Sequence, residues 1–417
     1  MPMLYLRKAI KQAHPVVGLT CDIEAMLFEP MTLREELMNY TVEALRTVED
    51  ILEHRDEWLA FEETLDNLQL ETCYKYLLSY WQNFCHSKLP ELGTSHELLV
   101  LFLRENNTLL AIYPFCKITR KRKKVFKVRS IEFIGQQISA GNYLDIISNE
   151  IENEAHQFVF DWLYQTEQFD YIFLNHIPDF SPNKNSVFYQ HQYFVTYSSE
   201  AILTNKQCYE EYRQCYPKKI RQKLNLLYSR INKSNYKLNF IIKDFEEDDL
   251  NEFRRLADHK NQKKHIENHY SVIGKKEFIE SLYTQFKTKV YYAQLNDQKI
   301  AFITNIQLNN HAVLFDTAYD LNYQDYSPGI LLFDECIKQG INNVNNHIVF
   351  GWGVDFFKFR LCNRFVRLSN SVLPGNKMFS TYWHNEVNQK CKNMAIDFQK
   401  ATDYLMSVTK HLTKHVS

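Results

Sequence analysis

The residues best suited to chemistry lie where a strand is predicted to end and a helix to begin, in DTAYDLNYQDYSPGILL, residues 316–332. Ser327 is a good N-cap and Pro328 a good first helical residue. The next backbone N–H groups, of Gly329, Ile330 and Leu331, have no intrahelical partner. Glycine lets a ligand approach the backbone, and the helix dipole favours negative charge there. The stretch fits a phosphate site, and it fits a plain capped helix equally well.

Two carboxylates precede this helix start. Asp316 and Asp320 are predicted to share one face of the strand, with Tyr319 on the other, because side chains alternate along a strand. Asp316 follows apolar residues, so partial burial and a raised pKa are expected. Either carboxylate is a candidate general base, and Tyr326 is a candidate proton donor to a leaving group. Asp320 also fits a turn residue at the strand end, and Tyr326 also fits ordinary packing.

The elements that would position these residues follow a regular order in the second half. A strand is expected at 237–245 and helices at 247–262 and 275–286, followed by strands at 289–295, 299–308 and 311–320, the helix from 327 and a strand at 348–352. The strands turn at Asn296-Asp297 and at Asn309-Asn310, which are hairpin signals. A basic helix, PKKIRQKLNLLYSRI, precedes them.

The first half shows a similar order. Helices are expected at 72–84 and 154–165, and strands at 96–119 with a turn at Asn106-Asn107, at 128–136, at 142–148 and at 171–177. Residues 31–58 have the apolar spacing of an amphipathic helix. The repeated order predicts a duplicated α/β (α+β) unit with largely antiparallel sheets. The expected domains are a helical extension at 1–60, units at 61–200 and 201–380, and a helical segment at 381–417.

Three strands, a Ser-Pro-Gly helix start and one more strand resemble the GNAT superfamily of acyl-CoA-dependent acyltransferases. The chain resembles in particular the CelD/BcsL type of acetyltransferase, which is associated with cellulose and polysaccharide biosynthesis. That family is similar to the Fem-type peptidyltransferases, which carry two GNAT-like units. The resemblance covers about residues 55–365 and is carried by the basic helix, the strand end AYD, YSPGILLFDECIKQG and FGWGVDFFKFRL.

The resemblance implies a cofactor site and an acceptor site. Backbone amides at Ser327, Gly329, Ile330 and Leu331 would hold the pyrophosphate of acetyl-CoA as co-substrate, with no metal. Lys358 matches a family lysine and would bind a phosphate or an acceptor carboxylate. Gln136, Ser139 and Asp145 match a segment that faces the acceptor. Alternatively, Lys358 is an ordinary exposed lysine, and Gln136, Ser139 and Asp145 belong to a polar loop without contact to an acceptor.

The sequence departs from the family at two positions. Val349 stands where the family has an aspartate, and Phe357 stands where it has a tyrosine. The expected function is an acyl-CoA-dependent N- or O-acyltransferase acting on a sugar or polysaccharide precursor. The alternatives are a Fem-like transferase that uses aminoacyl-tRNA and a non-catalytic adaptor for an anionic membrane or glycan.

Charge and cysteine content bound these alternatives. The net charge of −1 means that any anion-binding surface is local. Residues 117–129, from Lys117 to Arg129, include eight basic residues and fit a charged hairpin end, a membrane contact or a polyanion site. Nine cysteines without a C-x-x-C pair predict free thiols in a reducing compartment. With no signal peptide or membrane span apparent, a cytoplasmic protein is expected, and peripheral contact with the inner membrane is the alternative. His265 and His269 share a helical spacing, but no further metal ligands lie near them in the sequence.

Overall fold

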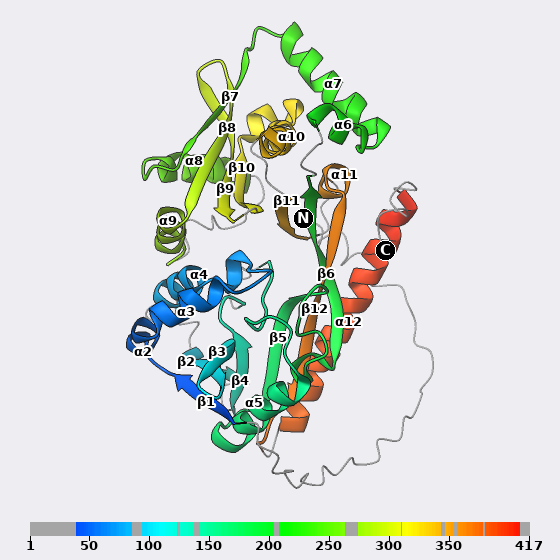
Figure 1. Ribbon diagram of the computed structural model, residues 1–417. Helices are drawn as coiled ribbons and strands as arrows, with labels where there is room; N and C mark the ends of the chain where they lie inside the picture. Colours follow the sequence, from blue (N-terminus) through cyan, green and yellow to red (C-terminus); the bar gives the residue numbers. More distant parts are fainter. Residues whose placement is uncertain are drawn as a thin grey trace. The chain divides into compact units, whose positions relative to one another are not determined.

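The computed structural model describes residues 39–85, 94–122, 126–136, 142–203, 208–262, 274–309, 311–342, 347–353, 357–377 and 380–408. In chain order the first half contains β1 (Tyr40–Leu45), α2 (Val48–Glu53), α3 (Arg55–Glu62), η2 (Leu70–Thr72), α4 (Tyr74–Tyr80), η3 (Trp81–Cys85), β2 (Thr94–Glu105), β3 (Thr108–Arg122), β4 (Phe126–Phe133), α5 (Asn153–Thr166), β5 (Tyr171–Pro178), η4 (Val187–Tyr189) and β6 (Gln192–Ile202). These elements run from blue to green in Figure 1.

The second half contains α6 (Tyr209–Gln214), α7 (Lys218–Lys233), β7 (Leu238–Asp244), α8 (Asp249–Gln262), α9 (Lys275–Gln285), β8 (Lys287–Leu295), β9 (Gln298–Leu308), β10 (His311–Tyr319), η6 (Leu321–Tyr326), α10 (Pro328–Asn342), β11 (His347–Trp352), α11 (Lys358–Leu361), β12 (Arg364–Pro374) and α12 (Ser380–Val408). The expected strands of this half, its basic helix and the helix that follows the Ser-Pro-Gly are thereby confirmed.

One mixed sheet of twelve strands joins the two halves, in the order β1-β2-β3-β4-β5-β12-β6-β11-β10-β9-β8-β7. The central strands are exchanged: β12 pairs with β5 of the first half, and β6 pairs with β11 of the second half. Each half therefore completes its sheet with a strand from the other. Figure 1 shows β6 and β12 side by side between the two sets of strands. The fold class, a mixed α/β fold with two similar units, is confirmed.

The expected helix at residues 31–58 is wrong for Tyr40–Leu45, which forms the edge strand β1. Val42 and Leu45 have helical spacing, but the segment pairs with β2 along its whole length. Pairing partners distant in sequence override local periodicity. The strand expected at 142–148 is also wrong: this segment is irregular apart from a single bridge between Ile112 and Ile147.

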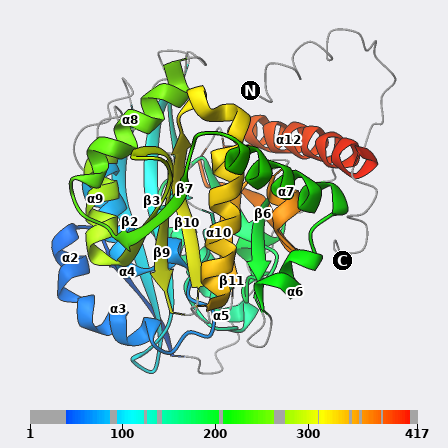
Figure 2. The ribbon, with the colours of Figure 1, turned by 90° about the horizontal axis from the view of Figure 1, so that it is seen from above.

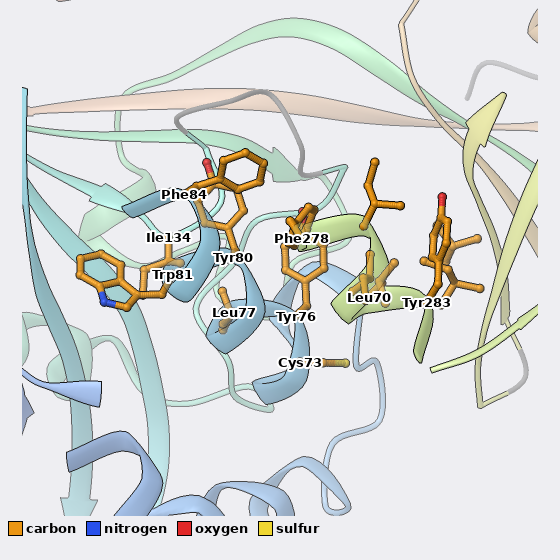
Figure 3. Packing of buried hydrophobic residues seen from close by; sticks show 14 of the residues in the cluster. Leu70, Cys73, Tyr76, Leu77, Tyr80, Trp81, Phe84, Ile134, Phe278 and Tyr283 are labelled. Carbon is orange, nitrogen blue, oxygen red and sulfur yellow. The ribbon is translucent and has the colours of Figure 1, made fainter. Parts of the chain in front are cut away.

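The main hydrophobic cluster is formed by residues from both halves, and its centre is the contact between α4 and α9. Phe278 of α9 lies against Tyr76, Tyr80 and Phe84, with ring centroids 5.2–5.7 Å apart (Figure 3). Each of these aromatic side chains is at most 2% exposed. Full burial of each ring contributes on the order of 1.5–3 kcal/mol, so this contact holds the first half against the helices that precede β8.

A second cluster covers the opposite face of the second unit, beneath α7 and α10. Ile220, Leu224, Leu227 and Ile231 recur at intervals of four and three residues and form the buried side of α7. Figure 2 shows α7 beside α10 over this part of the sheet. The packing leaves the N-terminus of α10 at the end of β10, where the candidate site lies.

Candidate functional site

The strands β10 and β11 run parallel and then part. Their pairing covers only three positions, ending at Val313 opposite Val349. Beyond this point β10 stays with β9 and β11 stays with β6, and the register of each strand shifts there. Such bulges bend a strand and redirect its side chains. A gap follows: among the described residues, no ladder pair joins β10 and β11 beyond Val313 and Val349, and η6 then leads from the end of β10 to α10.

The start of α10 differs from the expected side-chain cap. Ser327 has φ of 47° and ψ of 52°, in the left-handed region, whereas a side-chain N-cap residue normally has an extended backbone. Its carbonyl accepts hydrogen bonds from the N–H groups of Ile330 at 3.0 Å and Leu331 at 3.3 Å. The expectation that these two amides lack partners is therefore wrong. A left-handed non-glycine residue is strained, and such strain is often found at functional sites.

Gly329 retains the properties that a phosphate cradle needs. Its N–H makes no hydrogen bond to any other residue that the structure describes. A Cβ added at Gly329 would meet only the ring of Tyr319, at 3.9 Å, which is an ordinary contact. The first turn of α10 has no acidic residue to oppose an anion. A side chain as large as alanine would therefore fit at this position, and the N–H of Gly329 keeps its hydrogen-bonding capacity for a ligand.

Asp316 lies at the bulge of β10, beside the gap, and is half-buried. Its Oδ1 accepts a hydrogen bond from the N–H of Thr317 at 2.8 Å, and its own N–H donates to Thr304 Oγ1 at 3.0 Å. Burial lowers the pKa of Lys275 on α9, and the charge of Asp316 counteracts this shift. A lysine and a carboxylate therefore influence each other electrostatically on the side of the gap covered by α9.

Asp320 precedes the short helix η6 as its N-cap, and Tyr326 is the last residue of η6. Asp320 is 1% exposed and caps η6 by accepting the N–H of Asn322 at 2.9 Å. Despite the bulge, Asp316 interacts electrostatically with Lys275 of α9 and Asp320 lies 4.0 Å from Arg255 of α8, so the expected shared face of the two carboxylates stays a prediction that these contacts fit. Tyr326 is half-buried, with its ring centroid 5.7 Å from that of Tyr236.

Lys358 is buried, contrary to the alternative of an exposed lysine, and it holds the end of β11. Its Nζ donates to the carbonyls of Gly351 at 3.1 Å and Trp352 at 2.7 Å. On the other side, the N–H of Trp352 donates to Asn142 Oδ1 at 3.0 Å. The backbone N–H of Asn142 in turn donates to Glu71, whose pKa is raised by burial to about 7. Residues of both halves thus fix the strand that borders the gap.

Replacement of Lys358 tests this positioning role. Lys358→Met should lower the free energy of unfolding by about 1–3 kcal/mol, because one buried and one partly buried carbonyl lose their donor. Lys338→Met is the control, since Lys338 is exposed and both its ion pair with Glu335 at 3.9 Å and its approach to the ring of Tyr209 at 6.0 Å are long; it should change stability by less than about 0.5 kcal/mol. Urea unfolding measures both. Equal stability of the two variants would contradict a buried structural lysine.

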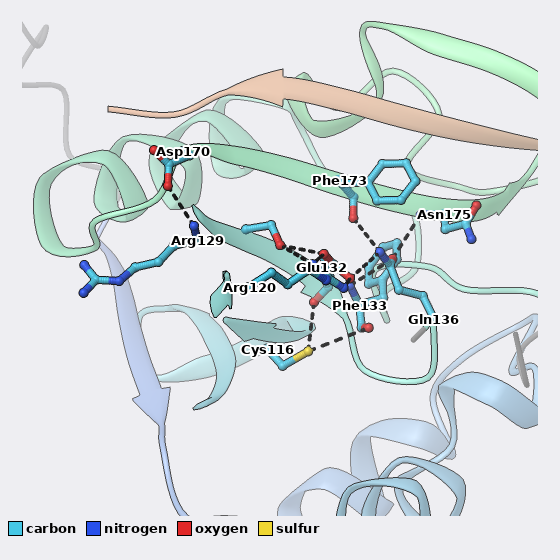
Figure 4. A network of polar contacts seen from close by, with 10 residues as sticks. Cys116, Arg120, Arg129, Glu132, Phe133, Gln136, Asp170, Phe173 and Asn175 are labelled. Atoms are coloured by element: carbon cyan, nitrogen blue, oxygen red, sulfur yellow. Dashed lines mark hydrogen bonds and ion pairs between the residues drawn. The ribbon is translucent and has the colours of Figure 1, made fainter. Parts of the chain in front are cut away.

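Gln136 closes the corresponding gap in the first unit. β4 and β5 also run parallel and pair at only two positions. The side chain of Gln136 bridges them: Oε1 accepts the N–H groups of Phe133 and Asn175, both at 3.2 Å, and Nε2 donates to the carbonyl of Phe173 at 2.9 Å (Figure 4). A role for Gln136 in acceptor binding stays a prediction, because these contacts account for its amide group.

A buried ion pair supports this closure. Gln136 Nε2 also donates to Glu132 Oε2 at 3.1 Å, and Arg120 binds the same carboxylate through both of its terminal nitrogens. Ser130 Oγ donates to Glu132 Oε1 at 2.5 Å. Although burial opposes ionisation, Arg120 and these donors hold the pKa of Glu132 below its ordinary value.

The helix that follows β4 is also unsuited to phosphate. The N-cap of α5 is Glu152, and its first turn contains Glu154. Negative charge at a helix N-terminus opposes a second anion there. Of the two units, the second alone combines an open gap with a helix start free of carboxylates in the part of the chain that the structure describes.

Asp145 is buried in the first unit, beside a hollow of about 210 Å³ that is lined in part by Gln69, Thr72 and Phe180. Its Oδ1 accepts hydrogen bonds from the Tyr189 hydroxyl at 2.6 Å and the Ile146 N–H at 2.8 Å. Burial raises the pKa of this carboxyl to about 6. Contact between Asp145 and an acceptor stays a prediction.

The raised pKa of Asp145 gives a pH-dependent prediction. The folded chain holds a proton on Asp145 that the unfolded chain releases near pH 4, so the favourable contribution is present below pH 4 and lost as pH rises through about 6. Asp145→Asn keeps both acceptor contacts without the charge. Its stability relative to wild type should therefore rise by roughly 2–3 kcal/mol between these limits. Thermal unfolding between about pH 4 and pH 6 measures the stability of both proteins. If their stabilities changed in parallel with pH, a raised pKa of Asp145 would be contradicted.

Sequence reasoning missed Glu200, a buried acid on β6. Glu200 lies opposite Val349 in the β6–β11 pair, so a carboxylate adjoins the position where the resembled family has aspartate. Its Oε1 accepts the Tyr143 hydroxyl at 2.5 Å, and Oε2 lies 3.5 Å from Arg364 and 3.7 Å from His347. These groups lower its pKa although burial opposes them. Because no strand is predicted for the β6 segment, the sequence gives no indication that Glu200 lies beside β11.

Several expectations fall outside the described residues. Ser139, His265, His269 and the turn residue Asn310 belong to this group. Among the residues that the structure describes, the cysteines are free: Cys73, Cys116, Cys336, Cys362 and Cys391 are buried, and Cys208 and Cys215 are exposed. No described helix combines the length and apolar character needed to cross a bilayer.

Comparison with known proteins assigns the second unit to a superfamily. Residues 218–358 match the family model described as "Acetyltransferase (GNAT) domain", so the chain contains a GNAT-superfamily domain that includes the gap and α10. No curated protein matches the sequence. The structure of FemX is similar at a TM-score of 0.53 and 10% identity, covering 82% of this chain and all of that one, which indicates a shared fold.

Two further solved structures are more distant. The C-terminal domain of a putative lysylphosphatidylglycerol synthetase from Agrobacterium fabrum has a TM-score of 0.46 and 10% identity, covering 84% of this chain and 96% of that one. A tandem GNAT protein from the clavulanic acid biosynthesis pathway has a TM-score of 0.39 and 7% identity, covering 80% and 98%.

Proposed function

We propose that the chain transfers an acyl group, in the first instance acetyl, from coenzyme A to an amine or hydroxyl of a sugar or polysaccharide precursor, as in the CelD/BcsL type that the sequence resembles. The observation that carries the proposal is the gap between β10 and β11 above the open Gly329 N–H. The GNAT domain match over residues 218–358 supports it. In the first unit Gln136 bridges β4 and β5, so the proposal places one cofactor site in each chain.

Different residues of the second unit would bind the cofactor and transfer protons in such a reaction. When bound, acetyl-CoA supplies an activated thioester. The α10 N-terminus, through Gly329, would hold its phosphates, since backbone amides and the helix dipole favour anions there. Asp316, beside the gap, is the residue that we assign to take the proton of the acceptor. Tyr326 is assigned to return a proton to the departing sulfur. Asp320, already committed to capping η6, is assigned a structural part.

The test is a transfer assay with amino sugars and sugar alcohols, read by mass spectrometry of the acetylated product. Asp316→Asn should lower kcat by roughly 10²–10⁴-fold, as expected for loss of a general base, with little change in the KM for acetyl-CoA. Asp320→Asn should act mainly on stability. Transfer that survives Asp316→Asn unchanged would remove Asp316 from the mechanism, and no transfer to any acceptor would overturn the sugar assignment.

A second candidate is a Fem-like transfer from aminoacyl-tRNA, favoured by the outer face of α7. Lys219, Lys223, Arg230 and Lys233 recur at helical spacing along one flank of the buried stripe, and α7 contains no acidic residue. Arg230 donates to the carbonyl of Asp325 at 2.7 Å, so this face reaches the loop before α10. Retention of tRNA that falls steeply with salt, together with no affinity for acetyl-CoA, would support this candidate over the first.

A further inference from the structure

Trp352, the last residue of β11, is exposed although its backbone is held by three other segments. It is 40% exposed, more than any other tryptophan that the structure describes. Its N–H donates to Asn142 Oδ1 at 3.0 Å, and its carbonyl accepts a hydrogen bond from Lys358 Nζ at 2.7 Å. The N–H of the next residue, Gly353, donates to the Tyr197 carbonyl at 2.8 Å. Because this backbone is already ordered, a ligand that contacts the ring loses little affinity to ordering it.

The chain around Trp352 has an unusual backbone conformation. Gly351 has φ of 81° and Gly353 has φ of 113°, values that favour glycine on both sides of the tryptophan. The Trp352 ring lies against that of His176 on β5, with ring centroids 5.1 Å apart. His176 is 7% exposed and has φ of 59°. A non-glycine residue in the left-handed region carries strain, and such residues cluster at functional sites.

Trp352 lies on the same face of the sheet as Asp316. On β11, Val349 is opposite Glu200, and Trp352 is opposite Ser198, two residues before Glu200 on β6. Residues two apart on a strand share a face, so the extra residue in the β11 bulge brings Trp352 to the face of Val349. Val349 belongs to the hydrophobic cluster that includes the buried residues of α4 and α9. Asp316 interacts electrostatically with groups of α9, which places it on that face as well.

Trp352 and Asp316 also occupy corresponding positions along the gap. Each is three residues beyond the last pair that joins β10 and β11, which is Val313 opposite Val349. The two strands run parallel, and a bulge follows that pair in each of them. The exposed ring and the carboxylate therefore border the gap from opposite strands. An acceptor that packs on Trp352 would extend toward Asp316.

We propose that Trp352 is the platform on which the sugar ring of the acceptor packs, and that it selects a pyranose over an open-chain amine or alcohol. This inference rests on the proposed acyl transfer. One face of a pyranose carries mainly C–H groups and packs well on an aromatic ring, while its edge carries the polar groups. A nucleobase also stacks on tryptophan, but the acceptor must present a nucleophilic amine or hydroxyl to Asp316. A sugar carries these groups around its edge.

Saturation-transfer NMR of the full chain with glucosamine tests this packing without requiring turnover. In wild type, protons on one face of the sugar ring should receive more saturation than those on the other face. Trp352→Ala should remove this pattern and raise the KM for glucosamine about ten- to a hundredfold, as expected for loss of a central aromatic contact. The ratio of kcat/KM for glucosamine to that for ethanolamine should fall by a similar factor. Trp352→Phe keeps an aromatic face and should retain most of the selectivity.

The matched control is Tyr382→Ala, which removes a ring that is 53% exposed at the start of α12. It should keep the saturation pattern and the selectivity of wild type. Circular dichroism checks that each variant is folded, and titration with acetyl-CoA checks that its cofactor site is intact.

Three results would overturn the inference: an unchanged saturation pattern in Trp352→Ala, an equal loss in Tyr382→Ala, or saturation of adenosine but not of glucosamine through Trp352. If Trp352→Ala acetylates glucosamine with the selectivity of wild type, the inference fails and the proposed function stands. If wild type binds no acetyl-CoA, the proposed function fails, and the inference that rests on it fails as well.

Discussion

Gly329→Ala is expected to weaken the binding of acetyl-CoA by roughly ten- to a hundredfold, the loss of one charge-assisted hydrogen bond, while the unfolding temperature does not fall. The added Cβ meets only Tyr319, at 3.9 Å, so the fold accommodates it. It would, however, occupy the space through which a phosphate reaches the backbone N–H. Gly329→Val should weaken binding further. Calorimetric titration and thermal unfolding measure the two effects separately.

Gly340→Ala in the same helix is the matched control. There the new Cβ would lie 2.6 Å from Ile348 Cδ1 and 3.0 Å from Leu203 Cδ1. Overpacking of this kind costs about 1–3 kcal/mol, so Gly340→Ala should unfold at a lower temperature and keep its affinity for acetyl-CoA. The opposite pattern, with Gly329→Ala destabilised and its affinity intact, would show that Gly329 serves packing rather than a ligand.

Arg120→Met is expected to lower the free energy of unfolding by about 3–5 kcal/mol near neutral pH, because it leaves Glu132 charged and buried without its partner. Glu132 is 2% exposed, and Arg120 contacts both of its oxygens. Arg367→Met, at an exposed position in β12, should change stability by less than about 0.5 kcal/mol. Affinity for acetyl-CoA should not change, because this ion pair closes the first unit.

The pH dependence makes the same variant more diagnostic. In wild type the pKa of Glu132 is lowered, so its contribution to stability is present above about pH 4.5 and is lost as pH falls through the folded pKa. Without Arg120, burial is opposed only by the hydrogen bonds from Ser130 and Gln136, so that pKa rises. Glu132 then takes up a proton more readily, and the deficit should shrink toward acidic pH. Urea unfolding at several pH values that gave a constant deficit would contradict a charged Glu132.

The regular part of the fold could be predicted because its signals are local. The turn at Asn106-Asn107 has positive φ at both residues, as its sequence predicts. The exchanged strands β6 and β12 could not be predicted, because their partners lie in the other half of the chain. β1 was misassigned for the same reason: residues such as Val42 fit a helical period and a strand alike.

The site was predictable in place but not in detail. The helix start at Pro328 and the strand before it follow from the sequence, and so does the open backbone at Gly329. The bulge at Asp316, the left-handed Ser327 and the burial of Lys358 do not, because each depends on contacts with distant segments. Gln136 illustrates the limit: its role becomes visible only when β4 and β5 are placed side by side.

The central claim is that the gap between β10 and β11, with the N-terminus of α10, is a site for one acyl-CoA. Isothermal titration of the full chain with acetyl-CoA tests it most directly, with Gly329→Val and Gln136→Ala titrated alongside. The account predicts one site per chain, lost in Gly329→Val and retained in Gln136→Ala, where only the closure of the first unit is removed. Absence of binding at millimolar acetyl-CoA, or binding that survives Gly329→Val and fails in Gln136→Ala, would contradict it.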